Sequence, residues 1–375
     1  MMNRVRKEDL QVGQPLPWPV YDSRGLLLLR RGYIISSPLQ LERLVQQGLY
    51  VDRTPPERRV EPPPDPAANS PFKLFDDLQT RLRRICDELR GGNSSPGLPD
   101  RILRLGRDIQ ALCAKDADAV LGAVHLLEDG HYTVVQALHA SILVEVFLHT
   151  LSISREDRLP ILAATLTKDI GMMDIHETLH RQQTPPSDEQ WKIIRQHPEY
   201  SAQTLEAAGV SDGVWLDAVL HHHERLDGSG YPHALKDEDI FFPVRVLAIV
   251  DIYCAMIKRR AHRTSFSPKE VLREIFLQRA GAVDEHLAKL FIKELGIFPP
   301  GVFVKLRNSE IAVVTHRRKD SKWPVVCSII GPRGAPLLKP VRRDPSHEEY
   351  EIRELIPRDR SVQVLPCVLW GYANA

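Results

Sequence analysis

The spacing of apolar residues changes along the chain, and each change predicts a different kind of structure. Between residues 72 and 89, large apolar residues recur at steps of three and four, which is the spacing of one face of an α-helix. A helical pattern with short breaks continues from about residue 100 to 295. Beyond Pro299 and Pro300, short β-type runs follow at 302–306, 310–315, 324–330 and 350–355. The pattern predicts a mainly α chain with a small β-rich domain at 299–375.

The apolar face between residues 72 and 89 has two interpretations. It lines either the core of the protein or a seam between two copies of the chain. The run is too short for a sustained coiled coil, which favours the core. The residues of this face are Phe72, Phe75, Leu78, Leu82, Ile85 and Leu89. The second interpretation would make the protein a homo-oligomer, and the pattern alone leaves that alternative open.

The N-terminal part of the chain has a composition of its own. Residues 1–53 are predicted to form a small α+β module, with strands at 16–21 and 25–30 and then a helix that Ser37 caps and Pro38 begins. Residues 54–71 are rich in proline and predict an extended linker. A helical lead-in at 72–130 then precedes a helical domain at 131–298, in which a further helix is expected to begin at 187–190.

Composition and charge limit the classes of function. The chain has 375 residues, 43% of them hydrophobic and 26% charged, as is ordinary for a globular protein of two or three domains. A net charge of +1 does not indicate the basic surface that binding to duplex nucleic acid requires. Five cysteines without paired spacing favour a reducing compartment. The apolar stretch at 244–257 is interrupted by charges and too short for a membrane span, so a cytoplasmic protein is expected.

The residues with the clearest chemistry lie between 222 and 232. His222, His223 and Glu224 directly precede a turn rich in glycine, Asp227-Gly228-Ser229-Gly230-Tyr231-Pro232. Adjacent imidazoles on one helical turn point about 100° apart, so a target that they share must lie close to the backbone, as a metal ion can. Asp251 lies within an apolar run, where a carboxylate needs a metal, a cation or several donors.

With these residues in place, the segment from about 132 to 286 resembles the HD-GYP family of metal-dependent phosphohydrolases. Residues 222–232 match its HHE-xx-DG-x-GYP motif, His197-Pro198 matches its upstream His-Pro, and 246–253 resemble its helix with a metal-binding Asp. The resemblance implies an HD-type all-helical bundle. It also implies metal ligands at Asp169, His197, His222, His223 and Asp251, catalytic roles for Asp169 and Glu224, and substrate contacts from Tyr231, Arg260 and Arg263.

The sequence departs from the family pattern in one half of the implied site. Lys168 stands where the family has the His of its His-Asp pair, and Gln136 stands where it has its first ligand His. Tyr132 replaces the Glu of members with a three-metal centre. Three imidazoles and one carboxylate remain in the other half, a donor set that suits iron, manganese or zinc. The prediction is a divalent metal site with one ion at most, or none.

The loss of two imidazoles leads to a specific hypothesis about Lys168. Its ammonium would lie where the first metal is bound in the family, paired with Asp169 and Asp251 as an internal replacement for the missing cation. An ammonium supplies charge but no activated water. The alternative is that Lys168 points into solvent, as most lysines do.

Two functions follow from the resemblance. One is an active phosphodiesterase that opens cyclic di-GMP or a related phosphodiester with a reduced metal site. The other is a catalytically impaired member of bacterial cyclic di-GMP signalling that acts as a sensor or an interaction scaffold, with a diguanylate cyclase (GGDEF) domain protein as a partner. The second is favoured, because losing a metal site removes charge stabilisation, usually the largest catalytic contribution.

Overall fold

The computed structural model describes most of the chain and separates it into two compact units, Met1–Asp65 and Pro66–Ala375. The described residues are 2–5, 9–16, 18–23, 27–29, 32–35, 37–46, 50–52, 70–92, 95–257, 268–277, 281–318, 322–358, 362 and 364–373. The predicted linker at 54–71 lies outside them except for its last two residues.

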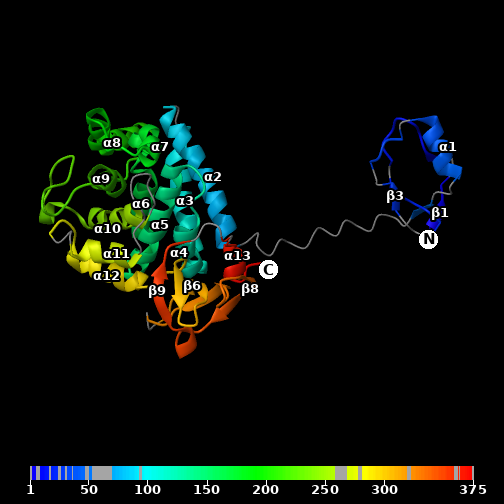
Figure 1. Cartoon of the computed structure of the whole chain (residues 1–375). Coiled ribbons are helices and arrows are strands. Elements are labelled where there is room, and N and C mark those ends of the chain that lie inside the picture. Colours follow the sequence, from blue (N-terminus) through cyan, green and yellow to red (C-terminus); the bar gives the residue numbers. More distant parts are fainter. Residues whose placement is uncertain are drawn as a thin grey trace. The chain divides into compact units, whose positions relative to one another are not determined.

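The first unit contains a small antiparallel sheet and one helix (Figure 1). Its strands are β1 (Met2–Arg4), β2 (Val20–Tyr21), β3 (Leu27–Leu29) and β4 (Tyr50–Asp52), in the order β1-β4-β2-β3. Helix α1 (Pro38–Gln46) begins as predicted, because Ser37 Oγ accepts the backbone N–H of Gln40 at 3.2 Å. Of the strand predicted at 16–21, the structure has β2 at Val20–Tyr21, and Leu16 forms separate backbone hydrogen bonds with Gly32 and Tyr33.

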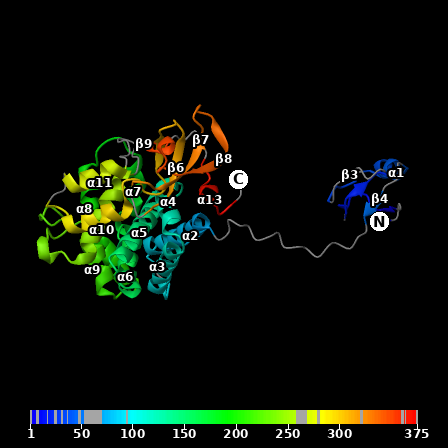
Figure 2. The same ribbon diagram turned by 90° about the horizontal axis from the view of Figure 1, so that it is seen from below.

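The second unit is built mainly of helices, which confirms the predicted fold class. Its helices surround a continuous apolar core (Figures 1 and 2). They are α2 (Pro71–Arg90), α3 (Leu98–Lys115), α4 (Ala117–Leu126), α5 (Tyr132–Thr150), α6 (Arg155–Thr167), α7 (Met173–Arg181), α8 (Asp188–Ala207), α9 (Gly213–His221), α10 (Phe242–Ile257), α11 (Pro268–Leu277), α12 (Glu285–Leu295) and the short α13 (Pro366–Leu369).

Helix α2 buries the whole apolar face that its sequence pattern predicts. All six of its predicted members are at most 4% exposed within a single chain. They pack against α3, α4 and α5, so the face belongs to the core. Ser70 caps the helix by accepting the backbone N–H of Lys73. The core interpretation of this face is therefore correct.

Helix α5 runs through the middle of this unit. It is long and apolar enough to cross a membrane, yet 83% of its most apolar window is buried inside the protein. Other helices pack around it, including α6 and α10 (Figure 1). That burial is the environment of a core helix, and it explains why α5 is apolar on all sides.

A five-stranded antiparallel sheet packs against α4 at one end of the bundle (Figures 1 and 2). Its strands are β5 (Phe303–Leu306), β6 (Ile311–His316), β7 (Val325–Ile330), β8 (Pro336–Arg343) and β9 (Ile352–Ile356), in the order β8-β7-β6-β5-β9. Four lie where the sequence predicts them, and β8 was not predicted. One set of side chains, including Phe303 and Val313, joins the helical core. The other set, including Val304 and Leu306, forms a second small core.

Local hydrogen bonds fix the start of α8 and the end of α6, two helices that position side chains of the candidate site. Helix α8 begins with a capping box in which Ser187 and Gln190 accept each other's backbone N–H groups, as predicted. At the end of α6, the hydroxyl of Thr167 accepts the indole N–H of Trp215 at 2.9 Å. This hydrogen bond holds the C-terminal end of α6 against α9.

One buried ion pair joins α5 to α6, and its loss should be costly. Arg158 donates from Nε to both oxygens of Glu145, at 3.2 and 3.1 Å, and the two residues are only 7% and 2% exposed. Arg158→Ala leaves Glu145 buried without this partner and should lower the free energy of unfolding by about 3–5 kcal/mol in urea titrations. The matched control Arg81→Ala removes an exposed pair with Asp108 and should cost at most about 1 kcal/mol. Equal losses in the two variants would contradict this account.

Candidate metal centre

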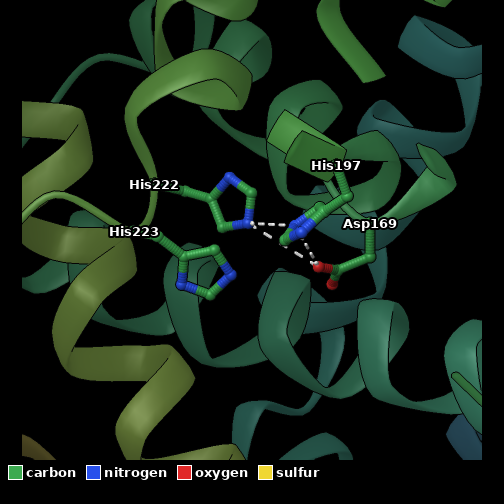
Figure 3. Close-up of side chains that lie close together, drawn as sticks. All are labelled: Asp169, His197, His222 and His223. Atoms are coloured by element: carbon green, nitrogen blue, oxygen red, sulfur yellow. Dashed lines mark hydrogen bonds and ion pairs between the residues drawn. The ribbon is translucent and has the colours of Figure 1, made fainter. Parts of the chain in front are cut away.

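Four predicted ligands converge in the structure. Asp169, His197, His222 and His223 each offer one ligand atom, and these atoms lie within 4.8 Å of one another. The Nε2 atoms of His197 and His222 are 3.2 Å apart, and Asp169 Oδ1 lies 3.5 and 3.6 Å from them. Figure 3 shows the three imidazoles and the carboxylate turned toward one another. Residues separated in sequence thus form one site.

Three segments deliver these side chains. Asp169 follows α6, His197 lies within α8, and His222 and His223 come directly after α9. The turn that starts with Asp169 approaches α8 closely at Gly171, where a Cβ atom would lie 2.7 Å from the carbonyl oxygen of His197. The Gly171 N–H also donates to Ser201 Oγ at 2.9 Å. A glycine at this position allows Asp169 to reach the imidazoles.

Hydrogen bonds fix the tautomers of two imidazoles. Nδ1 of His197 lies 2.7 Å from the carbonyl of Ile194, and Nδ1 of His222 lies 2.7 Å from the carbonyl of Val219. A carbonyl only accepts, so each Nδ1 carries a hydrogen, and a neutral imidazole held in this way presents a bare Nε2. Burial first, and then the charge of Lys168, lower the pKa of His222 to about 3, so this ring is neutral near pH 7.

In the neutral form that binds a metal ion, both rings offer Nε2 as an acceptor. These two Nε2 atoms and Asp169 Oδ1 face one another within 3.6 Å. Acceptors at such distances repel unless a positive centre lies among them. A divalent ion provides that centre, and its affinity for imidazole nitrogen and carboxylate oxygen fits this donor set. The residues present fit one ion on this side of the site.

The other side of the site contains Lys168 in place of an imidazole. Lys168 is 4% exposed, and its Nζ donates to Asp169 Oδ2 at 2.6 Å and forms an ion pair with Asp251 Oδ2 at 3.2 Å. Burial by itself lowers the pKa of a lysine, but Asp169 and Asp251 raise the pKa of Lys168 above its ordinary value. The predicted pairing is present, and the alternative that Lys168 points into solvent is wrong.

Asp169 connects the two sides because its oxygens have different partners. Oδ1 faces the imidazoles, whereas Oδ2 accepts from Lys168. Burial would raise the pKa of Asp169, but the ammonium of Lys168 holds it well below its usual range. Burial raises the pKa of Asp251, which projects from α10 and meets the same ammonium. One carboxylate therefore joins an imidazole side to an ammonium side.

Gln136, the other position that lacks its family imidazole, lies in the first turns of α5. Its side chain is partly buried, and its Oε1 has no hydrogen-bond partner among the described residues. An unpaired buried amide oxygen is costly, so the replacement at this position is not compensated within the described part of the chain.

The turn at residues 227–232, called the glycine-rich loop below, packs against the candidate metal ligands. A Cβ atom on Gly230 would lie 2.5 Å from the backbone of Glu224 and Arg225, so only glycine allows this approach. The ring of Tyr231 consequently lies against the ring of His223, with centroids 4.7 Å apart. Burial raises the pKa of the Tyr231 phenol. The predicted substrate contact thus borders the metal ligands.

Glu224 has contacts that the sequence did not indicate. Its oxygens accept the backbone N–H groups of His233 at 2.7 Å and Leu235 at 3.0 Å, and the residue is 1% exposed. These bonds hold the end of the glycine-rich loop. The catalytic role predicted for Glu224 remains a prediction. The predicted substrate contacts Arg260 and Arg263 lie outside the described residues.

Comparison with known proteins places this site in a family. Residues 125–287 match the HD domain family. The chain is 25% identical over 378 residues to "Cyclic di-GMP phosphodiesterase PA4108" of Pseudomonas aeruginosa, an alignment that covers 92% of this chain and 87% of that protein. The converging ligands, the glycine-rich loop and these matches agree. Together these findings support a member of the HD-GYP family.

Two further comparisons agree with this assignment. "Cyclic di-GMP phosphodiesterase PdeB" of Borreliella burgdorferi is 23% identical over 201 residues, about half of each chain at 53%. The solved structure of Bd1817, a HDG"Y"P protein from Bdellovibrio bacteriovorus, aligns with a TM-score of 0.52 and 14% identity. That alignment covers 79% of this chain and 99% of that one. At this identity the structural likeness shows a shared fold.

The buried ammonium of this HD-GYP protein should be essential for stability in the absence of metal. Lys168→Met leaves Asp169 and Asp251 without a cation, so the free energy of unfolding in a chelator should fall by about 3–5 kcal/mol. Added Mn²⁺ should stabilise the variant more than the wild type, because the ion then binds where the ammonium was. Urea titrations with and without Mn²⁺ measure both effects. Lys289→Met, at an exposed lysine of α12, is the control, and a Lys168→Met variant as stable as this control would refute the role of the ammonium.

Proposed function

We propose that this HD-GYP protein is a cytoplasmic component of cyclic di-GMP signalling that binds its ligand but is impaired in hydrolysis, and so acts as a sensor or an interaction scaffold. The ion pairs of Lys168 with Asp169 and Asp251 carry the proposal. They fill one half of the site with a fixed cation. Relatives named as cyclic di-GMP phosphodiesterases support the choice of ligand.

The chemistry of the two halves explains the proposed impairment. A divalent ion supplies a bound water of lowered pKa and neutralises charge on phosphoryl oxygens. Asp169, His197, His222 and His223 would hold one such ion, of iron, manganese or zinc. Lys168 also supplies positive charge, but an ammonium does not bind a water and lower its pKa as a metal ion does. The half of the site with Lys168 therefore cannot activate a nucleophile.

The remaining residues suit ligand binding. The Tyr231 ring, held beside His223 by the glycine-rich loop, offers an aromatic face for a guanine base. Arg260 and Arg263 are proposed to contact phosphate through paired N–H groups. A diguanylate cyclase (GGDEF) domain protein is the proposed protein partner.

An active phosphodiesterase with a reduced metal site is the alternative function. The intact imidazole side favours it, because two bare Nε2 atoms and a carboxylate can still hold one ion. One ion retains part of the electrostatic stabilisation of a phosphoryl transition state. The two functions therefore differ in turnover and agree in ligand binding.

The purified protein should bind cyclic di-GMP without hydrolysing it. With Mn²⁺ or Fe²⁺ present, we expect saturable binding of cyclic di-GMP and no hydrolysis above that of the variant His222→Ala, which lacks a metal ligand. Calorimetry measures binding and chromatography of the nucleotides measures hydrolysis. Turnover that His222→Ala abolishes would establish the active enzyme instead. Absence of both binding and turnover would exclude the sensor and leave the scaffold.

Restoring the two imidazoles should restore the missing half of the site. The double variant Gln136→His/Lys168→His replaces an amide and an ammonium with imidazoles at the two positions where the family has ligand histidines. We expect one additional ion per chain by elemental analysis and a gain in hydrolysis of at least about tenfold, or roughly 1.4 kcal/mol in barrier height. The single variants are the controls and should gain less than the double. Unchanged metal content and hydrolysis in the double variant would end this proposal.

A further inference from the structure

A second pair of histidines lies outside the metal centre, at the junction of α9 and the glycine-rich loop. His221 is the last residue of α9, and His233 directly follows the loop. Nε2 of His221 and Nδ1 of His233 are 3.0 Å apart. Their ring centroids are 5.2 Å apart and their planes are inclined by 58°, so the rings meet edge to edge through nitrogen.

This pair has the geometry of the histidine pair in the metal centre. His197 and His222 have centroids 5.1 Å apart, planes inclined by 62° and nitrogens 3.2 Å apart. Two nitrogens bound to one ion at about 2.1 Å lie about 3.0 Å apart when the bond angle is near 90°, and about 3.4 Å apart near 109°. The separation of 3.0 Å at His221 and His233 lies within this range.

A carboxylate orients the first imidazole of this pair. Nδ1 of His221 lies 2.9 Å from Oδ1 of Asp217, one helical turn earlier on α9. An imidazole that donates from Nδ1 to a carboxylate presents Nε2 outward with raised basicity, as metal-bound histidines commonly do. The Asp217 carboxylate thus orients His221 through Nδ1, as the Val219 carbonyl orients His222. Asp217, His221 and His233 form a chain that ends at an exposed imidazole.

We propose that His221 and His233 bind a divalent transition-metal ion, such as Zn²⁺ or Ni²⁺, at a site separate from the metal centre. Without the ion, the Nδ1–H of His233 donates to Nε2 of His221. On binding, the hydrogen of His233 moves to its own Nε2, both facing nitrogens coordinate the ion, and water completes the coordination sphere. No net proton is released by the neutral pair. The exposure of His233 gives the ion a route from solvent.

The ion would clamp the glycine-rich loop to α9. His233 lies two residues beyond Tyr231, and its backbone N–H already donates to Glu224. A second attachment through its ring fixes the segment that follows the loop. Tyr231 is then held beside His223 from both sides of the turn. The site would therefore stiffen the region that borders the metal centre without touching its ligands.

Zinc binding by the full chain tests this site independently of any nucleotide. After chelation and dialysis, titration with Zn²⁺ alone should give one more bound ion per chain in the wild type than in His233→Ala or His221→Gln. The ion lost in these variants should persist in His222→Ala, which removes a ligand of the metal centre. Asp217→Asn should weaken the same binding event by about 10- to 100-fold.

His347→Ala, at an exposed histidine in the loop after β8, is the matched control and should bind as much zinc as the wild type. Thermal unfolding with and without Zn²⁺ provides a second measurement, because zinc should shift the midpoint less in His233→Ala than in His347→Ala. Equal stoichiometry and equal shifts in these two variants would overturn the proposal. So would loss of the same ion in His222→Ala, since the two sites would then be one.

Discussion

Two carboxylates buried in one pocket need a positive charge between them, and this requirement shapes the centre of the protein. Asp169 and Asp251 come from different helical segments and meet at the ammonium of Lys168. Without a cation, burial and mutual repulsion would force one of them to take up a proton or leave the pocket. The lysine meets this need with a group that belongs to the chain. The fold of the pocket therefore does not require a metal on that side.

The same arrangement explains how half of a metal centre can persist beside a half that has been replaced. Asp169 turns one oxygen toward Lys168 and the other toward two imidazoles whose hydrogens are bound to backbone carbonyls. The imidazole side depends on α8, on the end of α9 and on the close approach at Gly171. None of these contacts involves Gln136. Loss of imidazoles at two positions thus left the geometry of the opposite side intact.

The sequence predicted the parts of this structure that depend on local patterns. Helical periodicity located the buried face of α2, and the motif around His222 identified ligands that converge with Asp169. The resemblance to the HD-GYP family placed Lys168 at a metal-binding position beside Asp169, and the cost of burying Asp251 without a partner then led to the proposed ion pairs. These predictions combine residue type and spacing with the resemblance to that family.

Contacts between distant segments were less accessible to sequence reasoning. Glu224 is part of the family motif, and only the structure shows that its oxygens accept N–H groups from nine and eleven residues onward. The facing nitrogens of His221 and His233 depend on the path of the glycine-rich loop, which no periodicity specifies. Strand β8 contains two prolines and many exposed residues, so it lacks the alternation that marks a strand.

Anomalous diffraction from crystals grown with Mn²⁺ would test the central role of Lys168 most directly. The account predicts one manganese peak in the pocket, bounded by Asp169 Oδ1 and the imidazoles of His197, His222 and His223. It also predicts density for Lys168 Nζ between Asp169 Oδ2 and Asp251. A second manganese peak between those two carboxylates, with Lys168 turned out of the pocket, would contradict it.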